Sequence, residues 1–380
     1  MLDKVPIVCE NFVSRRYGED DVHRVILWGP GQMGVGALRA LIQHPGLELA
    51  GVVVHSEVKD GRDAGNLCGL PPTGVMATRD IDAALELHAD VVAYYASGDY
   101  RYREAADDIA RCLRAGKNVV TTSLVPFCYP PAAEADIREM LEAACAEGGT
   151  TLFNSGVEPG WINDMVPFAF SATCSRIDKI TMQEILDYAP IAQPDIMYDF
   201  MGFAHPPDYA APLHQPGRLN SLWSPVVWGL ADAHGLQLDS VDDTLEYWIA
   251  PESYETASGP LPAGTVGAMW FRLIGLKDGE ERIVLEHITR MGEHSAPDWP
   301  RHPSPLGGYR VILDGMPTYT VDIEMHGRGS NMRGLSYATF MRPLNAVPAV
   351  VAAPPGIASS HDLPLVAGVM SGAEWTGIIQ

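Results

Sequence analysis

Residues 25–36 read Val-Ile-Leu-Trp-Gly-Pro-Gly-Gln-Met-Gly-Val-Gly, and this stretch predicts the fold of the first half of the chain. Four apolar residues are typical of a buried strand, and Gly29, Gly31 and Gly34 follow at the spacing G-x-G-x-x-G before a helical run. In a dinucleotide site one glycine permits the tight turn, one lets the backbone approach a pyrophosphate, and one lets the helix pack against the strand. The phosphates then lie at the positive end of the helix dipole. The stretch therefore predicts dinucleotide binding, with an ordinary glycine-rich turn as the alternative.

Strands and helices alternate through the first 155 residues. Apolar runs predict further strands at residues 47–54, 90–95, 118–122 and 151–154. Segments with helical periodicity lie between them at residues 81–88, 102–115 and 131–147. This βαβ spacing predicts an α/β domain over residues 22–158, with a doubly wound parallel sheet of the Rossmann type that binds the dinucleotide.

A different pattern begins after residue 158, where strands no longer alternate with helices. A helix, a strand and two hairpins are expected at residues 161–171, 177–188, 265–291 and 309–325. Asp278-Gly279 supplies the turn of the first hairpin, and a stretch rich in loops runs to about Leu222. Residues 159–331 are therefore expected to form a second α+β domain, with a mainly antiparallel sheet, for substrate binding and oligomerisation.

The two ends of the chain are assigned separately. A helix over residues 341–351 is expected to return to the first domain, so that residues 332–380 complete it. Residues 1–21 have mixed charge and little periodicity, and are expected to be a tail or an arm. The ligand is expected between the two domains. A homodimer through the second sheet is predicted by analogy with similar folds.

The composition excludes several classes of partner. The 380 residues carry a formal net charge of −22, which opposes binding to nucleic acid or to an anionic membrane, since both select a basic surface. Six cysteines occur without a C-x-x-C pair or a zinc-like cluster, so free thiols and no metal site are expected. No apolar run resembles a membrane span or a secretion signal, so a cytoplasmic location and a small-molecule substrate are expected.

The loops after the predicted parallel strands are expected to surround the cofactor, because such strand ends meet at one edge of the sheet. The expected contacts are Gly29, Gly31, Gln32, Met33, Gly34, His55, Ser56, Lys59, Tyr95, Ala96, Ser97, Thr122, Ser123, Asn154 and Gly156. An acid about 20 residues past the glycine loop is typical of NAD sites, but counting from Gly34 reaches only Val54. Ser56, Lys59 and Arg62 instead suit a 2′-phosphate, so NADP is predicted. NAD, or a loop that contacts no ribose, is the alternative.

Four motifs together resemble one superfamily. They are Gly-Pro-Gly-Gln-Met-Gly at 29–34, Gly-Arg-Asp-Ala-Gly at 61–65, Gly-Lys-Asn-Val-Val at 116–120 and Gly-Val-Glu-Pro-Gly at 156–160. They are similar to the dihydrodipicolinate reductase-like superfamily, and within it to the branch of 2,4-diaminopentanoate dehydrogenase and native amine dehydrogenases. The resemblance implies interconversion of a carbonyl plus ammonia with an amine, through an imine and a nicotinamide hydride. It also implies a carboxylate near C4 of the nicotinamide ring.

The chain departs from that branch where the carboxylate is expected. In members of that branch the sequence after the fifth strand resembles Cys-Glu-Glu-Leu, whereas this chain has Thr-Ser-Leu-Val-Pro-Phe at 122–127. A carboxylate appears instead at Glu158, where the branch more often has asparagine before Pro-Gly. Glu158 is therefore predicted as the acid/base, with a role in bracing the following helix start as the alternative.

The second half of the chain supplies further candidates. His205 is predicted to protonate an alkoxide if the substrate is a ketone, and Tyr188 is a further catalytic candidate. The predicted substrate pocket comprises Leu124, Trp161, Glu184 and Tyr209. For each of these side chains, an ordinary place in the core or at the surface is the alternative.

The sequence therefore predicts an NAD(P)-dependent oxidoreductase that transfers a hydride between nicotinamide and the C=N or C=O carbon of a largely apolar small molecule. The amine dehydrogenase-like form of this activity acts on CH-NH2 or C=N. A ketone or alcohol oxidoreductase is the alternative within enzymes. A non-catalytic NAD(P)-binding sensor or scaffold is the alternative from another class.

Overall fold

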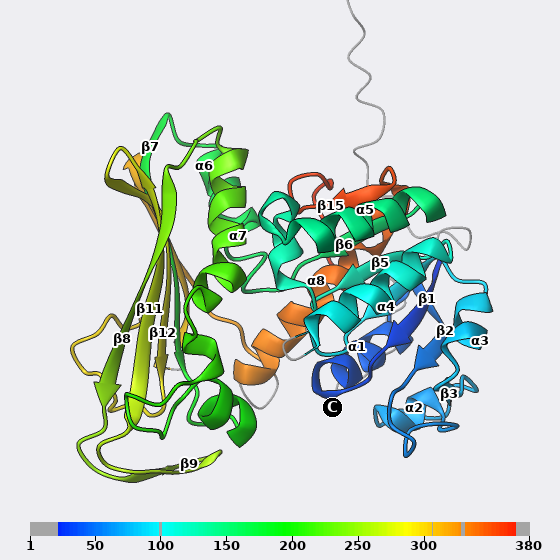
Figure 1. Cartoon of the computed structure of the whole chain (residues 1–380), viewed down its shortest axis with the longest axis horizontal. Coiled ribbons are helices and arrows are strands. Elements are labelled where there is room, and N and C mark those ends of the chain that lie inside the picture. The colour runs from blue at the N-terminus through cyan, green and yellow to red at the C-terminus, as the bar shows by residue number, and fades with distance from the viewer. Residues whose placement is uncertain (1–21, 99–100, 306, 328–330, 370–380) are drawn as a thin grey trace, which may run out of the picture.

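The computed structural model describes residues 22–98, 101–305, 307–327 and 331–369. Two lobes lie side by side in these residues, one built on a parallel sheet and one on a long mixed sheet (Figure 1). The arm predicted over residues 1–21 lies outside the described residues, as does the segment from residue 370 onward. No helix in the described part of the chain combines the length and apolarity needed to span a bilayer.

The first lobe contains the predicted doubly wound sheet. Within the described residues its strand order is β15-β6-β5-β4-β1-β2-β3, and each neighbouring pair is parallel. The strands are β1 (His23–Trp28), β2 (Leu47–Val53), β3 (Ala77–Thr78), β4 (Val91–Tyr94), β5 (Asn118–Thr121), β6 (Thr151–Asn154) and β15 (Gly356–Ala358). The order reverses direction at β1 and β4, which is where such sheets bind nucleotides.

Helices cover both faces of this sheet because its strands are apolar on both faces. Val25 and Leu27 of β1 belong to one core cluster, while Ile26 and Trp28 belong to the other. The first face packs against α1 (Gln32–Ile42) and α8 (Asn331–Ala352), and the second against α3 (Ile81–Glu86), α4 (Tyr102–Arg114) and α5 (Ala135–Gly148). The short helices are α2 (Ala64–Leu67), η2 (Val125–Cys128) and η3 (Pro130–Ala132).

The end of the chain returns to this first lobe. Helix α8 packs against α1, and β15 pairs in parallel with β6. The side chain of Phe340 on α8 lies over Gly36 of α1, where a Cβ atom would come within 2.6 Å of the ring. The hydroxyl of Tyr95 also donates a hydrogen bond of 2.7 Å to the carbonyl of Phe340. The domain boundaries proposed from the sequence stay a prediction, but these contacts agree with the expected return.

The second lobe is built on a sheet with the strand order β14-β13-β7-β12-β11-β8 in the described residues. Its strands are β7 (Arg176–Asp187), β8 (Ser240–Ile249), β11 (Val266–Lys277), β12 (Glu280–Arg290), β13 (Gly307–Met316) and β14 (Tyr319–Ile323). All pairs are antiparallel except β7 with β12, so the sheet is mainly antiparallel as predicted. Asp278 and Gly279 have φ of 54° and 78°, as the predicted tight turn between β11 and β12 requires.

The sequence prediction missed or misplaced several elements of this lobe. The remaining elements are α6 (Met165–Ser171), π-helix η4 (Asp195–Phe200), η5 (Pro212–His214), α7 (Arg218–Ala233), β9 (Tyr254–Thr256) and β10 (Gly259–Leu261). The helix expected from residue 161 begins only at Met165, because residues 161–164 form turns. Strand β8 was not predicted, since acidic residues at 242 and 243 interrupt its apolar pattern at the edge of the sheet.

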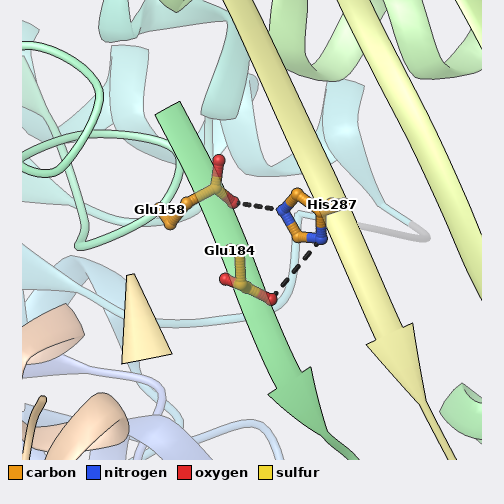
Figure 2. A group of neighbouring side chains, drawn as sticks. All are labelled: Glu158, Glu184 and His287. Atoms are coloured by element: carbon orange, nitrogen blue, oxygen red, sulfur yellow. Dashed lines mark hydrogen bonds and ion pairs between the residues drawn. The ribbon is translucent and has the colours of Figure 1, made fainter. Parts of the chain in front are cut away.

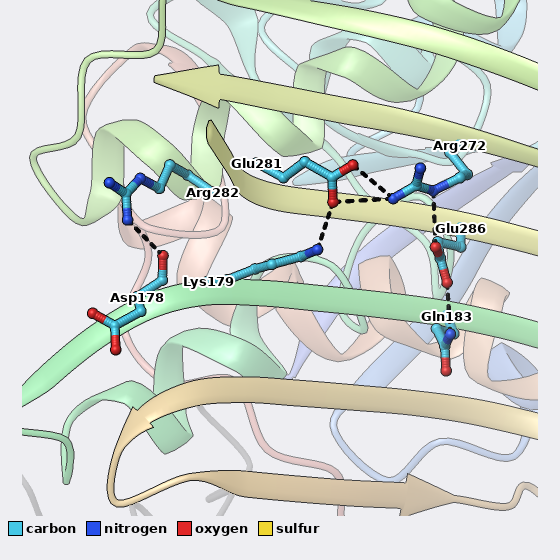
Figure 3. A network of polar contacts seen from close by, with 7 residues as sticks. All are labelled: Asp178, Lys179, Gln183, Arg272, Glu281, Arg282 and Glu286. Carbon is cyan, nitrogen blue, oxygen red and sulfur yellow. Dashed lines mark hydrogen bonds and ion pairs between the residues drawn. The ribbon is translucent and has the colours of Figure 1, made fainter. Parts of the chain in front are cut away.

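The two faces of the second sheet differ. Helices α6 and α7 lie on one side (Figure 1). The reverse face carries a polar network in which Glu286 accepts hydrogen bonds from Gln183, at 2.6 Å, and from Arg272, at 3.0 Å (Figure 3). Arg272 also donates to Glu281, which pairs with Lys179 at 2.5 Å. This face therefore carries a polar network among buried apolar residues such as Val284 and Ile288.

The glycine loop depends on close backbone contact. Gly29 has φ of 85°, which favours glycine, and its carbonyl oxygen lies 2.0 Å from where a Cβ atom on Gly34 would stand. A Cβ atom on Gly31 would instead meet only that same oxygen, at 4.0 Å. In this motif Gly34 thus packs against the loop backbone, whereas Gly31 faces open space.

We expect Gly34→Ala to lower the free energy of unfolding by at least about 2 kcal/mol, because its Cβ atom cannot fit without moving the loop backbone. The gain of about 1 kcal/mol that alanine brings inside a helix is too small to offset this. Gly31→Ala is the matched control and should unfold like the wild type. Urea denaturation measures both, and equal stability of the two variants would contradict the close packing.

Candidate active site

A cavity of about 620 Å³ lies at the carboxyl edge of the parallel sheet. It is bounded by the glycine loop, by the segments after β2, β4 and β5, and by residues of the second half of the chain. The predicted cofactor residues that line it are Gly29, Gly31, Gln32, Met33, His55, Ser56, Lys59, Tyr95, Ala96, Ser97, Thr122 and Ser123. The structure therefore brings these residues together around one space.

The amino end of α1 opens into this cavity and fits a phosphate group. Gly31 caps the helix without a side-chain hydrogen bond, and the first turn contains no acidic residue. Gly31 to Met33 line the cavity, and a Cβ atom on Gly31 would have no close neighbour. The helix dipole and the free backbone N–H groups thus point at a space that no described side chain fills.

A second cavity, of about 960 Å³, adjoins the first. Both are lined by Gln32, Met33, Gln193, Ile196 and Ser336. The walls of the second cavity are mainly apolar and include Val35, Ile191, Met197, Phe200, Met201, Leu213, Trp223, Phe271 and Phe340. A ligand in the first cavity therefore reaches an apolar chamber between the lobes.

Three ionisable side chains line this second cavity and contact one another: Glu158, Glu184 and His287 (Figure 2). His287 Nε2 lies 2.7 Å from Glu158 Oε2, and His287 Nδ1 lies 3.4 Å from Glu184 Oε1. The side chain of Glu158 is 3% exposed, that of Glu184 is 5% exposed and that of His287 is 6% exposed. We refer to these three residues as the Glu-His-Glu cluster.

Strand register positions two of the three residues of the cluster, Glu184 and His287. Phe271, His287, Glu184 and Tyr309 are directly paired neighbours on β11, β12, β7 and β13, so they form one row across the sheet. The Phe271 ring stacks on the His287 ring, with centroids 4.6 Å apart. Glu158 comes from the other lobe, on the loop after β6, so the cluster forms only where the lobes meet.

Aromatic hydroxyl and indole groups complete the hydrogen bonds of the cluster. Tyr188 donates to Glu184 Oε1 at 2.7 Å, and Tyr309 also donates to Glu184. Trp223 Nε1 donates to Glu158 Oε2 at 3.1 Å. Glu158 Oε1 is buried and has no hydrogen-bond partner among the described residues. That oxygen is therefore available to a ligand.

The charges of the cluster shift its pKa values. Burial lowers the pKa of His287, but Glu184 and Glu158 outweigh burial and raise this pKa to about 9. Burial raises the pKa of the Glu184 carboxyl, while the charge of His287 acts in the opposite direction. Burial and Glu184 also raise the pKa of the Tyr188 hydroxyl, which keeps it a donor. The cluster therefore places two carboxyl groups against one imidazolium in an apolar chamber.

The cluster has a spacing that a metal ion could use, since its three ligand atoms lie within 4.8 Å of one another. A metal needs an unprotonated imidazole nitrogen, however, and His287 Nε2 is already engaged with Glu158. The raised pKa of His287 also opposes loss of its proton. The absence of a metal therefore stays a prediction from the sequence.

Several predicted site residues lie elsewhere. His205 and Tyr209 stack on each other, with ring centroids 3.9 Å apart, and neither lines either cavity. The reason is local: the backbone N–H of Val266 donates to the His205 carbonyl, which ties this loop to the start of β11. This arrangement corrects two predictions: that His205 donates a proton to the substrate, and that Tyr209 lines the substrate pocket. Trp161, which is 36% exposed, also lies outside both cavities.

Four other predicted contacts belong to the supporting structure. Leu124 is fully buried in the core beside β5, and its N–H donates to Asn154 Oδ1 at 3.0 Å. The Asn154 side chain is thereby occupied beneath the cavity. Gly34 packs on the carbonyl of Gly29, and Gly156 forms a bridge with Gly160. These four residues support the backbone around the site and line neither cavity.

The sequence prediction missed His287, although a signal was present. Glu286 and His287 interrupt the apolar residues between Ile283 and Ile288, and alternation places His287 on the same face as Leu285 in the core. The aromatic partners Trp223 and Phe271 carried no such signal. Gln193 and Ile196 were missed because they stand in a loop and a π-helix without periodicity.

The fold and the site define a nicotinamide-dependent oxidoreductase, because the glycine-loop cavity leads a cofactor ring directly to buried groups able to move protons. Residues 23–124 match the family model described as dihydrodipicolinate reductase, N-terminus. Residues 161–376 match the model described as 2,4-diaminopentanoate dehydrogenase C-terminal domain.

Relatives agree with these matches. An amine dehydrogenase of Streptomyces virginiae is 39% identical over 344 residues, or 90% of this chain and 96% of the relative. A 2,4-diaminopentanoate dehydrogenase of Acetoanaerobium sticklandii is 24% identical over 357 residues, or 91% and 95% of the two chains. The solved amine dehydrogenase of Mycobacterium smegmatis shares the fold, with a TM-score of 0.73 and 21% identity over 91% of this chain and 97% of that one. The chain belongs to the 2,4-diaminopentanoate dehydrogenase and amine dehydrogenase family.

The raised pKa of His287 predicts a pH dependence of stability. Between about 6.5 and about 9, the folded protein holds a proton on His287 that the unfolded chain has released. The stability from this group is therefore complete below about pH 6.5 and is lost as the pH rises through about 9.

We expect the stability advantage of the wild type over His287→Gln to shrink across that pH range, by on the order of 2–3 kcal/mol. Urea denaturation of both proteins from pH 6 to pH 10 measures the difference. An advantage that stays constant over this range would mean that His287 is neutral in the folded protein.

Proposed function

We propose that this enzyme catalyses NADPH-dependent reductive amination of an apolar ketone or aldehyde, and the reverse deamination of the amine. The observation that carries the proposal is the Glu-His-Glu cluster, whose Glu158 Oε1 is buried without a partner among the described residues in an apolar chamber beside the cofactor cavity. An ammonium ion or a protonated amine supplies an N–H donor to this oxygen. The names of the relatives from Streptomyces virginiae and Mycobacterium smegmatis support the same chemistry.

The reaction balances with one extra proton. A ketone, an ammonium ion, NADPH and a proton give the alkylammonium ion, NADP⁺ and water. The cofactor, when bound, supplies the hydride to the substrate carbon, and the protein moves the protons.

Glu158 is the proposed acid/base. Its Oε2 is held by His287 and Trp223, which leaves Oε1 to take a proton from the ammonium ion and free the nitrogen lone pair. Glu158 then returns this proton to the hydroxyl that leaves as water. His287 stays protonated and holds both carboxylates in place, while Tyr188 orients Glu184.

This assignment accounts for the departure from related sequences at residues 122–127. Ser123 lines the cofactor cavity and Leu124 is buried in the core, so this strand end brings no carboxylate into the chamber. Glu158 supplies one from the loop after the neighbouring strand β6. The proposal therefore places the acid/base on the loop after β6.

The walls of the chamber favour a bulky apolar substrate. The side chains of Met197, Phe200, Met201 and Leu213 face the space in front of the cluster. Arg39 is the one cationic residue among the described lining residues besides His287, and it donates to the carbonyl of Cys68 at 3.2 Å. No described cation stands beside the cluster to receive a substrate carboxylate, so a simple amine fits better than an amino acid.

We expect Glu158→Gln to lower kcat for reductive amination at least about 100-fold, because proton transfer is lost. NADP⁺ should still bind, because Glu158 does not line the cofactor cavity. Glu255→Gln, on an exposed part of β9, is the matched control and should retain full activity. The measurement is NADPH oxidation with a panel of apolar ketones, with and without ammonia. Turnover that needs no ammonia would replace the proposal with ketone reduction, and unchanged kcat in Glu158→Gln would remove Glu158 from the chemistry.

We further propose that NADP is preferred over NAD. His55, Ser56, Lys59 and Arg101 line the cofactor cavity, and none of its described lining residues is acidic. Glu57, the nearest acid after β2, pairs with an arginine on the exposed surface and does not line the cavity. The basic and hydroxyl groups support binding of a 2′-phosphate.

Lys59→Ala is expected to weaken binding of NADP⁺ about tenfold and leave binding of NAD⁺ nearly unchanged, since only NADP⁺ carries the 2′-phosphate. Lys59 Nζ lies 2.6 Å from the carbonyl of Pro30, so this charge stands directly over the glycine loop. Lys117→Ala, which removes a lysine bonded to the Leu87 carbonyl, is the control. Titration of protein fluorescence with each nucleotide gives the dissociation constants, and equal losses for both nucleotides would contradict the preference.

A homodimer through the second sheet and a cytoplasmic location are also proposals. The five described cysteines, all free thiols, support a reducing compartment. The mass of the protein in solution distinguishes monomer from dimer, and fractionation of cells reports the location.

A further inference from the structure

The residue Gln193 stands where the two cavities meet. Of the residues that line both cavities, Gln32 and Met33 come from α1 and Ser336 from α8, which pack together in the first lobe. Gln193 and Ile196 come instead from the segment that enters π-helix η4, on the second lobe. Gln193 is therefore the polar side chain that the second lobe contributes to this junction.

The backbone of Gln193 is fixed, while its side chain is free. Its N–H donates to Ser258 Oγ at 3.0 Å, and Ser258 in turn donates to the carbonyl of Ile191 at 2.6 Å. The carbonyl of Gln193 accepts from the N–H groups of Ile196 and Met197, at 3.1 Å and 2.9 Å. Within the described residues the side-chain amide forms no hydrogen bond. The protein thus presents an unpaired amide on a rigid support.

An amide group at this junction matches one part of the cofactor. A glutamine side chain offers donors and an acceptor side by side, and a second amide is complementary to both. The reactive ring of a nicotinamide nucleotide carries such a group, its carboxamide. The neighbouring Met33 and Ile196 offer no competing polar side chain.

We propose that Gln193 hydrogen-bonds the carboxamide of the nicotinamide ring, and that the second lobe orients the ring through this contact. The glycine loop holds the diphosphate from the first lobe, so the cofactor is gripped by both lobes. A fixed carboxamide decides which face of the ring is turned towards the Glu-His-Glu cluster. Gln193 is a positioning residue for hydride transfer. The inference rests on nicotinamide binding and is independent of whether the substrate is an amine or an alcohol.

The test compares the natural oxidised cofactor with its 3-acetylpyridine analogue, in which a methyl group replaces the NH2 of the carboxamide. Dissociation constants are measured by fluorescence titration for the wild type and Gln193→Leu, using whichever of NADP⁺ and NAD⁺ binds more tightly. The wild type should bind the natural cofactor about 3–10-fold more tightly than the analogue, and Gln193→Leu should lose that discrimination. Ser258→Ala, which frees the Gln193 backbone, should reduce the discrimination partly.

The controls separate this contact from a general loss of structure. Gln215→Leu changes a glutamine of the same lobe that lines neither cavity, and it should leave discrimination unchanged. Equal weakening of the natural cofactor and the analogue in Gln193→Leu would place the contact on another part of the nucleotide and overturn the proposal. If only Gln32→Leu lost discrimination between the natural cofactor and the analogue, the contact with the carboxamide would belong to Gln32 on α1. That result would also overturn the proposal. Circular dichroism of each variant checks that it is folded.

Discussion

The hydrogen bond between Glu158 and His287 is the contact on which the rest of this enzyme depends. It joins the loop after β6 in the first lobe to β12 in the second, over 2.7 Å and almost out of contact with water. Removing one partner of a buried ion pair typically costs about 3–5 kcal/mol, because the other charge is left uncompensated. The bond therefore holds the lobes at one separation, and that separation determines where the cofactor cavity opens into the apolar chamber.

The chamber stays both polar enough for proton transfer and apolar enough for a bulky substrate because its ionisable groups are confined to one cluster, in which His287 and Glu184 share a row of the sheet and Glu158 faces them from the other lobe. Strand register aligns Phe271, His287, Glu184 and Tyr309 across four strands, and the aromatic rings at the two ends exclude water from the ionised groups between them. Their low-dielectric surroundings strengthen the attraction among the charges, which is why the pKa of His287 rises to about 9 despite its burial. Glu158 Oε1 is left to accept a hydrogen bond from a ligand.

Much of the first lobe could be predicted from the sequence, because its signals are local. The motif Gly29–Gly34, the apolar strands and the helical periods between them are read within short windows, and the cofactor contacts follow from where parallel strands end. The second lobe was predicted less well. A loop such as that around His205 has no period, so its direction depends on which strand it is tied to, here β11. Strand β8 and the start of α6 were missed for the same lack of a local signal.

The sequence by itself determined the strand, glycine loop and helix that lead into α1, and predicted a dinucleotide against its amino end, because glycine spacing and strand–helix alternation are properties of neighbouring residues. It also predicted Glu158 as the acid/base and Glu184 as a residue of the substrate pocket, without showing that the two side chains share one cluster. Only the tertiary structure decided that, since 129 residues separate Glu158 from His287 and contact between them requires the docking of two lobes. Side-chain direction on a strand is fixed by alternation, but which strands become neighbours is fixed by the packing of the whole chain.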